Sequence, residues 1–348
     1  MKPDQCRAFA RILVNEALGV LPGDKVLIQG PADAKPLILA AYEQVLEMGA
    51  FPSQRVQFEE SDCIFFTHAT PEQLDYLSPV DLAVLENCDK FLFIRTETNT
   101  SLLDQIPASA LARRRQAVSP SFGLIQGKQW CSTLYPSQAL ATKAGISLPE
   151  YDEWFAGVVL ASNSGLAERG AVLATLLIDK KRVEIKSPDT DLSFSIEGRQ
   201  WVISSGRHNV PDGEIFSAPV EDSVEGHIVF DVPVEFDGHW IENARLEFRK
   251  GQVVKASASR GEDALRALLG TDEGTKRVGE FGIGLNEKIT SPMGHVCIDE
   301  KMRGSIHLAL GFSLADTGGK NVSQIHFDFI KDLRQEGQVL VDGSLVDL

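Results

Sequence analysis

The chain has 348 residues, of which 43% are hydrophobic and 24% are charged. These proportions are typical of a folded globular protein with about two domains, and they exclude a disordered chain. Asp and Glu number 49 against 34 Lys and Arg, so the formal net charge is −15. This acidic balance argues against nucleic-acid or anionic-membrane partners, because both favour basic surfaces.

The cysteines are odd in number and scattered along the chain, at Cys6, Cys63, Cys88, Cys131 and Cys297. Because none forms a C-x-x-C pair, we expect neither a disulfide framework nor a Cys-rich zinc site, and a reducing cytoplasm is the expected setting. Charged residues at close intervals in the first 20 positions argue against a signal peptide. The sequence contains no apolar run of the ~18 residues that a membrane span needs.

The first half of the chain alternates between helical and strand-like patterns. The expected elements are a helix over 4–18, a strand over 25–29, a helix over 34–48, a strand over 52–58, a helix from 71 capped by Thr70, and a strand over 90–94. This alternation predicts an N-terminal α/β domain over residues 1–150 with a mostly parallel sheet. Residues 148–178 are expected to be helical and to join the two halves.

Beyond about residue 180 the pattern changes to short strand-like runs separated by glycines. The clearest runs are 182–185, 192–196, 227–230 and 245–248, and one helix is expected at 262–270. They predict a β-rich, antiparallel, barrel-like C-terminal domain over residues 151–348. The fold class expected for the whole chain is therefore α/β plus α+β. Val296 and Ile298 also suggest a buried strand around Cys297.

Residues 323–330 carry the first chemical signal. In a strand, Ile325, Phe327 and Phe329 share one face, and His326 and Asp328 share the other. An imidazole and a carboxylate two residues apart can hold one metal ion. The alternative is a surface strand whose polar face is solvated.

Three more segments add residues of the metal-ligand type. His307 lies in an apolar run between Gly304 and Gly311, where a lone histidine can also be a core residue. Glu280 lies in a glycine-rich apolar run and, if buried, needs a metal, another cation or a proton. Glu214 enters a strand after a turn, and both glutamates can equally be solvated. Together, the four segments predict a metal site in the C-terminal domain.

The segments 22–28, 209–230, 279–286, 304–311 and 317–328, taken in this order, carry a family resemblance. The chain resembles the metallo-aminopeptidases of the aminopeptidase T and aminopeptidase S type, also called thermophilic or leucyl aminopeptidases. The resemblance extends over most of the chain. It implies a homodimer that removes N-terminal amino acids from peptides with a free N-terminus.

The resemblance also implies two divalent metal ions (Zn, Co or Mn). The implied ligands are Glu214, Glu280, His307, His326 and Asp328, with Glu280 and Glu214 as catalytic carboxylates. Three carboxylates and two neutral imidazoles around two divalent ions leave one positive charge, which a bridging hydroxide would neutralise. Such a pair activates water and polarises the scissile carbonyl. We expect a carboxylate to bridge the ions, and both Glu280 and Glu214 remain candidates. Glu221, Asp222 and Glu225 are candidate general bases, with a solvated turn as the alternative.

One departure from the family pattern concerns Leu314. The family usually has a tyrosine at this position, and its expected role is to hydrogen-bond the tetrahedral oxyanion. All four tyrosines of the chain lie within the first 151 residues. Ser313, Lys320 or a residue of the other domain are the candidates for this role, and slow peptide cleavage or a different substrate is expected.

Two alternatives to the peptidase follow from the same comparison. Mononuclear iron(II) ring-cleaving dioxygenases of dihydroxypyridines share the final His-x-Asp, but carry a histidine near the position of Glu280 and lack the carboxylate at Glu214. The presence of both glutamates and His307 favours the peptidase. The other alternative is a metal-binding homologue with little peptidase activity, to which Leu314 points.

Overall fold

The computed structural model describes residues 1–97, 106, 108–125, 127–161 and 164–348. The chain folds into two compact units. Unit 1 comprises Met1–Ala161 together with Gly206–Pro211, and unit 2 comprises Ser162–Ser205 together with Asp212–Leu348. The proposed domain boundary near residue 150 stays a prediction, because compactness alone does not show which part folds independently.

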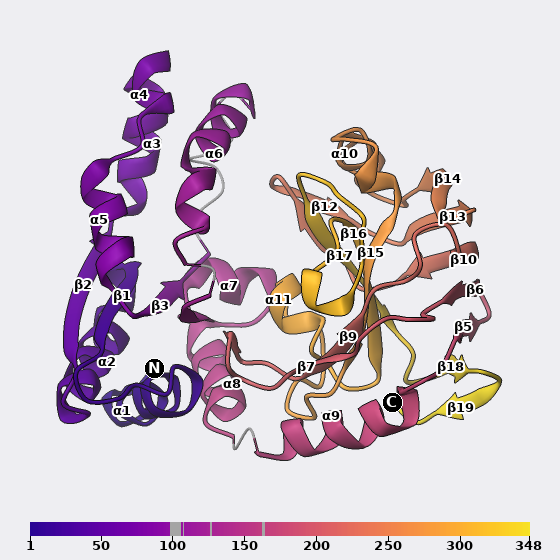
Figure 1. Ribbon diagram of the computed structural model, residues 1–348, viewed down its shortest axis with the longest axis horizontal. Helices are drawn as coiled ribbons and strands as arrows, with labels where there is room; N and C mark the ends of the chain where they lie inside the picture. The colour runs from indigo at the N-terminus through magenta and orange to yellow at the C-terminus, as the bar shows by residue number, and fades with distance from the viewer. Residues whose placement is uncertain (98–105, 107, 126, 162–163) are drawn as a thin grey trace. The chain divides into compact units, whose positions relative to one another are not determined.

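Unit 1 contains a parallel sheet with helices in its connections (Figure 1). Its elements are α1 (Pro3–Arg11), η1 (Ile12–Ala17), β1 (Lys25–Pro31), η2 (Ala32–Ala34), α2 (Lys35–Glu47), β2 (Phe51–Gln57), α3 (Glu59–His68), α4 (Pro71–Asp75), α5 (Pro79–Asn87), β3 (Lys90–Arg95), α6 (Ala108–Phe122), β4 (Gln129–Leu134), α7 (Gln138–Lys143), α8 (Leu148–Val159) and β8 (Asn209–Val210). The five strands lie in the order β2-β1-β3-β4-β8, and each neighbouring pair is parallel. This confirms the predicted α/β part.

Local sequence signals explain several boundaries in unit 1. The Thr70 hydroxyl accepts a hydrogen bond from the Gln73 backbone N–H, and the Gln73 side chain reciprocates, so α4 begins with a capping box. Gly49, with φ of +73°, ends the turn after α2, where a left-handed backbone favours glycine. The predicted helix over 4–18 is α1 followed by the π-helical turn η1.

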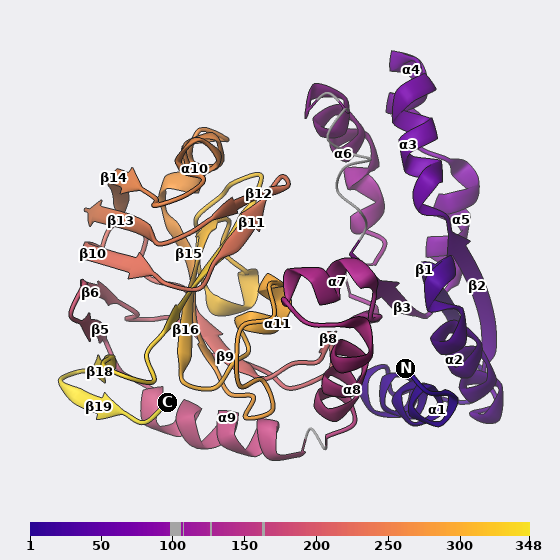
Figure 2. The same cartoon turned by 180° about the vertical axis from the view of Figure 1, so that it is seen from behind.

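Unit 2 is β-rich, and every strand pair in its described sheets is antiparallel (Figure 2). Its elements are α9 (Ser164–Leu177), β5 (Arg182–Ser187), β6 (Thr190–Ser195), β7 (Val202–Ser204), β9 (Glu214–Ser217), β10 (Glu225–Phe230), β11 (Val234–Phe236), β12 (His239–Ile241), β13 (Ala244–Arg249), β14 (Gln252–Ser257), α10 (Glu262–Leu269), η4 (Gly274–Lys276), β15 (Val278–Gly284), α11 (Val296–Asp299), β16 (Ser305–Gly311), η5 (Ala315–Thr317), β17 (His326–Asp332), β18 (Gln338–Val341) and β19 (Ser344–Val346). The predicted antiparallel β-rich part is confirmed.

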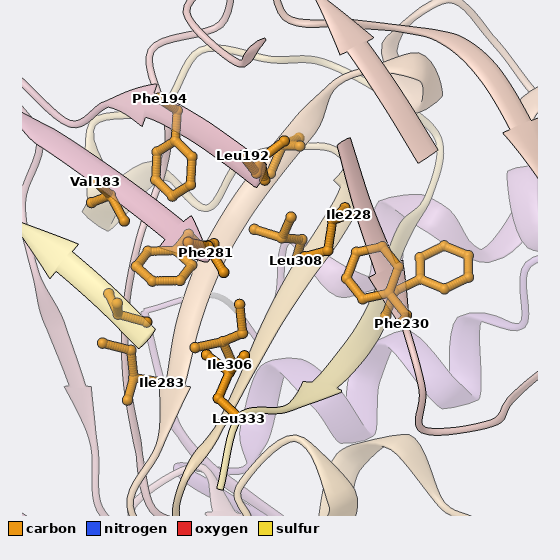
Figure 3. Packing of buried hydrophobic residues seen from close by; sticks show 14 of the residues in the cluster. Val183, Leu192, Phe194, Ile228, Phe230, Phe281, Ile283, Ile306, Leu308 and Leu333 are labelled. Carbon is orange, nitrogen blue, oxygen red and sulfur yellow. The ribbon is translucent and has the colours of Figure 1, made fainter. Parts of the chain in front are cut away.

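The core of unit 2 lies between two sheets. One has the order β14-β13-β10-β6-β5-β18-β19, and the other has the order β17-β16-β15-β9-β7. Phe194 of the first sheet and Phe281 of the second meet edge to face, with ring centroids 5.1 Å apart (Figure 3). Ile283, Ile306 and Leu308 pack into the same cluster. The second sheet therefore has one apolar face in the core and an opposite face that is free to carry polar groups.

One local prediction is wrong. Cys297 lies in the short helix α11 and is exposed, so it is not a buried strand thiol. The apolar neighbours Val296 and Ile298 resemble strand alternation, but Ile298 is buried on one side of a helical turn. Across the described residues, none of the helices combines the length and the apolarity needed to cross a membrane.

Candidate metal centre

Four neighbouring strands of the second sheet carry the predicted ligands. Phe327 and Phe329 of β17 pack against the core of unit 2, and His326 and Asp328 alternate with them. The same alternation in β16 buries Ile306 and Leu308 in the core and leaves His307 on the other face. The structure therefore shows the predicted division of residues 325–329, with apolar side chains on one face and His326 and Asp328 on the other.

Each of the five predicted ligands has a glycine or alanine opposite it on at least one neighbouring strand. The cross-strand pairs are Gly284 with Glu214, Gly282 with His307, Ala309 with both Glu280 and Asp328, and Gly311 with His326. At Gly282 the reason is steric, because a Cβ there would lie 2.0 Å from His307 Nε2. Gly282 thus makes room for the imidazole of His307 on a crowded sheet face.

The ligands form overlapping groups whose ligand atoms lie within 4.8 Å of one another. The structure brings together all five predicted residues, and Glu300 is an additional member. The groups are Glu214, Glu280 and His307; Glu280, His326 and Asp328; and Glu300, His307 and Asp328.

Glu280 lies between the two histidines. Its Oε1 is 3.3 Å from His307 Nε2, and its Oε2 is 3.8 Å from His326 Nε2. Glu214 Oε2 approaches His307 Nε2 from another side at 3.2 Å. Two carboxylates therefore converge on one ring nitrogen of His307, although that nitrogen offers only one proton or one lone pair.

His326 has the tautomer that a metal ligand needs. Its Nδ1 lies 2.8 Å from the Phe312 carbonyl oxygen, which can only accept, so Nδ1 carries the proton. The free Nε2 lies 3.8 Å from Glu280 Oε2 and 3.9 Å from Asp328 Oδ2. Ligand atoms ~2.0–2.2 Å from one ion lie at most about 4.4 Å apart, so these spacings suit a shared cation.

Several buried oxygens of the cluster have no hydrogen-bond partner among the described residues. They are Glu214 Oε2, Glu280 Oε2 and Asp328 Oδ1. A buried carboxylate oxygen without a partner is costly. A donor set of carboxylates and imidazoles with unused oxygens fits divalent metal ions, which would satisfy these atoms.

Burial and charge act in opposite directions on the ionisable groups of the cluster. Burial opposes ionisation of Glu214, but the charges of Lys301 and His307 outweigh it and hold the pKa of Glu214 down at about 2. Burial works against protonation of His307, yet the carboxylates of Glu214 and Glu280 raise the pKa of His307 well above its usual range. Burial also raises the pKa of Asp328, against the attraction of His326 and His307. Burial and neighbouring charges thus shift the pKa values of these three groups together.

Comparison with protein families decides the assignment. The family model described as thermophilic metalloprotease (M29) matches residues 3–343. The chain belongs to the M29 family. It is accordingly a metallohydrolase of the aminopeptidase class, which confirms the predicted resemblance and the predicted class of enzyme.

M29 relatives include aminopeptidases from several bacteria. Aminopeptidase 2 of Geobacillus stearothermophilus is 26% identical, over 97% of this chain and 94% of the relative. Aminopeptidase AmpS of Bacillus subtilis is 32% identical, over 39% of this chain and 38% of the relative.

Solved structures agree on the fold. Wild-type AmpT from Thermus thermophilus superimposes with a TM-score of 0.85 at 21% identity, covering 99% of this chain and 97% of AmpT. The 2,5-dihydroxypyridine dioxygenase of Pseudomonas putida KT2440 has a TM-score of 0.65 at 17% identity, covering 100% of this chain and 96% of the dioxygenase. The weaker match to the dioxygenase leaves the aminopeptidase assignment standing.

Two residues of the candidate metal centre were not predicted from the sequence. Glu300 contributes a carboxylate to the ligand cluster, and Lys301 places its ammonium 2.5 Å from Glu214 Oε1. Both follow the four-residue helix α11, where neither strand alternation nor helical periodicity marks them. The charged run Asp299-Glu300-Lys301 has the composition of a solvated loop, yet Lys301 is only 2% exposed.

The predicted general-base candidates lie outside the metal groups found among the described residues. Glu221 pairs with Arg199 at 2.6 Å and accepts a hydrogen bond from the Lys320 backbone N–H. Asp222 is exposed, and Glu225 is exposed and accepts from the Lys250 backbone N–H. Their roles as bases stay predictions that the geometry does not favour.

Leu314 and its neighbours lie directly after the residue that orients His326. Leu314 is half-buried and precedes the 3-10 turn η5. The Ser313 hydroxyl is buried and has no hydrogen-bond partner among the described residues. Lys320 is exposed. Of the two named candidates for an oxyanion donor, Ser313 is the one next to Phe312, whose carbonyl holds His326.

Proposed function

We propose that this M29 protein is an aminopeptidase that works with two divalent metal ions, held by Glu214, Glu280, His307, His326 and Asp328. The observation that carries the proposal is the placement of Glu280, because its two carboxylate oxygens face two different histidines. A carboxylate in this position is suited to bridging two ions. Of the two candidates left open by the sequence, the geometry therefore favours Glu280 as the bridge.

The remaining ligands belong to overlapping groups around Glu280. One group with Glu280 contains Glu214 and His307, the other contains His326 and Asp328, and a third group joins His307 and Asp328 with Glu300. When bound, the ions would supply an acidified water and a Lewis acid for the scissile carbonyl. Glu214 and Glu280 are the proposed catalytic carboxylates, because they lie among these ligands and fix the charge around the reacting atoms.

The proposed substrates are peptides with a free N-terminus, as the names of the M29 relatives suggest. The net charge of −15 favours the approach of a cationic amine. Zinc, cobalt and manganese all suit a set of carboxylates and imidazoles. We also propose that the protein forms a homodimer and is located in the cytoplasm.

The absence of a tyrosine at position 314 bears on the rate. Removing one oxyanion donor from a hydrolase costs about 10²–10³ in turnover. We therefore propose slow cleavage of peptides, with the Ser313 hydroxyl as the candidate substitute.

The test is metal content and amide cleavage on the same sample. Protein purified without chelator is analysed for metals and assayed on leucine chromogenic amides. Two equivalents of zinc, cobalt or manganese with metal-dependent cleavage support the proposal. Glu280→Gln should abolish cleavage and lower the metal content. The matched control is Glu247→Gln, on the strand β13 of the other sheet. This substitution should change neither the cleavage rate nor the metal content. Cleavage that survives in Glu280→Gln contradicts the site assignment.

A second function is favoured by one observation, the shared fold of the 2,5-dihydroxypyridine dioxygenase. One equivalent of iron, no amide cleavage and oxygen consumption with a dihydroxypyridine would make ring cleavage the leading function. Two equivalents of metal without turnover on a broad peptide panel would instead indicate a metal-binding homologue.

A further inference from the structure

Lys301 is a buried lysine whose ammonium lies among carboxylates. Its Nζ is 2.5 Å from Glu214 Oε1, 2.8 Å from Glu300 Oε1 and 3.9 Å from Asp212 Oδ1. The Lys301 side chain is 2% exposed, and its three partners are buried. A lysine is rarely taken out of water unless it is paired, so these contacts account for its burial.

Because of the contact with Lys301, the two carboxylate oxygens of Glu214 have different neighbours. Oε1 accepts from Lys301, and Oε2 points towards His307 and has no hydrogen-bond partner among the described residues. Glu300 is held in the same way through its Oε1, and it also belongs to a group with His307 and Asp328. One ammonium thus fixes two carboxylates at the edge of the ligand cluster.

We propose that Lys301 is a positioning residue of the metal centre, which holds one oxygen of Glu214 and thereby makes Glu214 a ligand through its other oxygen alone. The inference rests on the proposed function, because it concerns the same ligands. Carboxylates bind metals through one or both oxygens, and both oxygens count toward the coordination number. A donor that occupies Oε1 keeps the number of protein ligands low and leaves room for water and substrate.

A second buried lysine of unit 2 provides the matched control. Lys331 is 2% exposed and bonds Asp189 at 3.0 Å and the Val229 carbonyl at 2.9 Å. Neither partner is a proposed ligand. Asp189 is exposed, so Lys331→Met removes a buried ammonium paired with a surface carboxylate, from the same unit and without touching Glu214. It controls for the general cost of losing a buried, paired lysine.

The experiment uses cobalt(II) chloride alone as the probe. Metal-free wild type, Lys301→Met and Lys331→Met are titrated with cobalt, and the visible d–d absorption per bound ion is recorded. These bands weaken as the coordination number of cobalt rises. We expect Lys301→Met to lose absorption intensity per cobalt relative to the wild type, because Glu214 can then bind through both oxygens. Lys331→Met should match the wild type. Identical spectra for all three proteins overturn the proposal, as does an equal change in both variants.

Lys301→Met leaves Glu214 and Glu300 without their cation, so it can fail to fold. The double variant Glu300→Gln with Lys301→Met keeps the net charge, removes both charges of one ion pair together, and leaves an amide oxygen at position 300, which belongs to the group with His307 and Asp328. It should show the same loss of intensity, and a wild-type spectrum from it overturns the proposal. The wild-type titration separates the two claims. If the wild type binds no cobalt, the proposed function fails. If it binds cobalt and the Lys301 variants do not differ from it, only the positioning role fails.

Discussion

Substituting Gly282 by alanine tests whether the glycine exists to make room for His307. The new Cβ would lie 2.0 Å from His307 Nε2 and 2.2 Å from its Cε1, whereas ordinary contact begins at 3.4 Å. The ring must therefore move by 3.4 − 2.0 = 1.4 Å, unless the strand moves instead. A metal–nitrogen bond is only ~2.0–2.1 Å long, so a shift of this size removes His307 from the coordination sphere.

Two magnitudes follow from this displacement. Overpacking a filled site costs about 1–3 kcal/mol of folding free energy, and His307 is fully buried, so its ring cannot relax into solvent. Losing even an indirect partner of a metal ligand costs about 10–100-fold in affinity, and losing a ligand should cost at least as much. We expect Gly282→Ala to weaken metal binding by this factor and to lower the stability of the metal-free protein.

The assay combines chelator competition for metal affinity with calorimetry in excess chelator. The control is Gly157→Ala in α8, where an added Cβ meets nothing within 4 Å. There the change should stabilise the protein by about 0.4–1 kcal/mol. A Gly282→Ala protein with wild-type metal affinity and wild-type stability would refute the steric argument. It would show that the strands β15 and β16 can adjust to an added methyl group at this position.

Two further predictions concern stability. Burial opposes ionisation of Asp272, but hydrogen bonds from the Gln324 backbone, the Ser323 hydroxyl and Thr275 lower its pKa from 3.8. The stability that the ionised Asp272 contributes is therefore complete above about pH 3.8 and is lost as the pH falls through the lowered pKa. The melting temperatures of Asp272→Asn and the wild type should accordingly converge in acid. A difference in melting temperature that stays constant with pH would contradict this. Metal at ~100 times its Kd should stabilise the wild type by about 2.7 kcal/mol over chelator-treated protein. Unchanged melting on chelation would argue against a folded-state metal site.

The sequence predicts the ligand-bearing face well where strand alternation applies. His326 and Asp328 alternate with Phe327 and Phe329, and a period of two leaves only one arrangement for a strand with an apolar face. Glycine inside a strand can indicate a close approach, but Gly282 was not interpreted in this way from the sequence. Both patterns are local, so a single sequence suffices to read them.

Lys301 and Glu300 could not be predicted, because their role depends on contacts across the chain. The partner of Lys301, Glu214, is 87 residues away in sequence, and nothing in the run 299–301 distinguishes a buried ammonium from a solvated one. Glu221 illustrates the opposite case. It lies close to Glu214 in sequence, but Arg199 and the Lys320 backbone hold it elsewhere. Proximity along the chain was a poor guide to proximity in space.

The short strand β8 has a consequence for dissecting the protein. It belongs to unit 1 and pairs with β4, yet it is encoded between β7 and β9 of unit 2. A fragment that stops at residue 161 would expose the outer edge of β4 as unpaired backbone, and such edges invite aggregation. A recombinant unit 1 therefore calls for residues 206–211 to be grafted after α8 through a linker, rather than for a simple truncation.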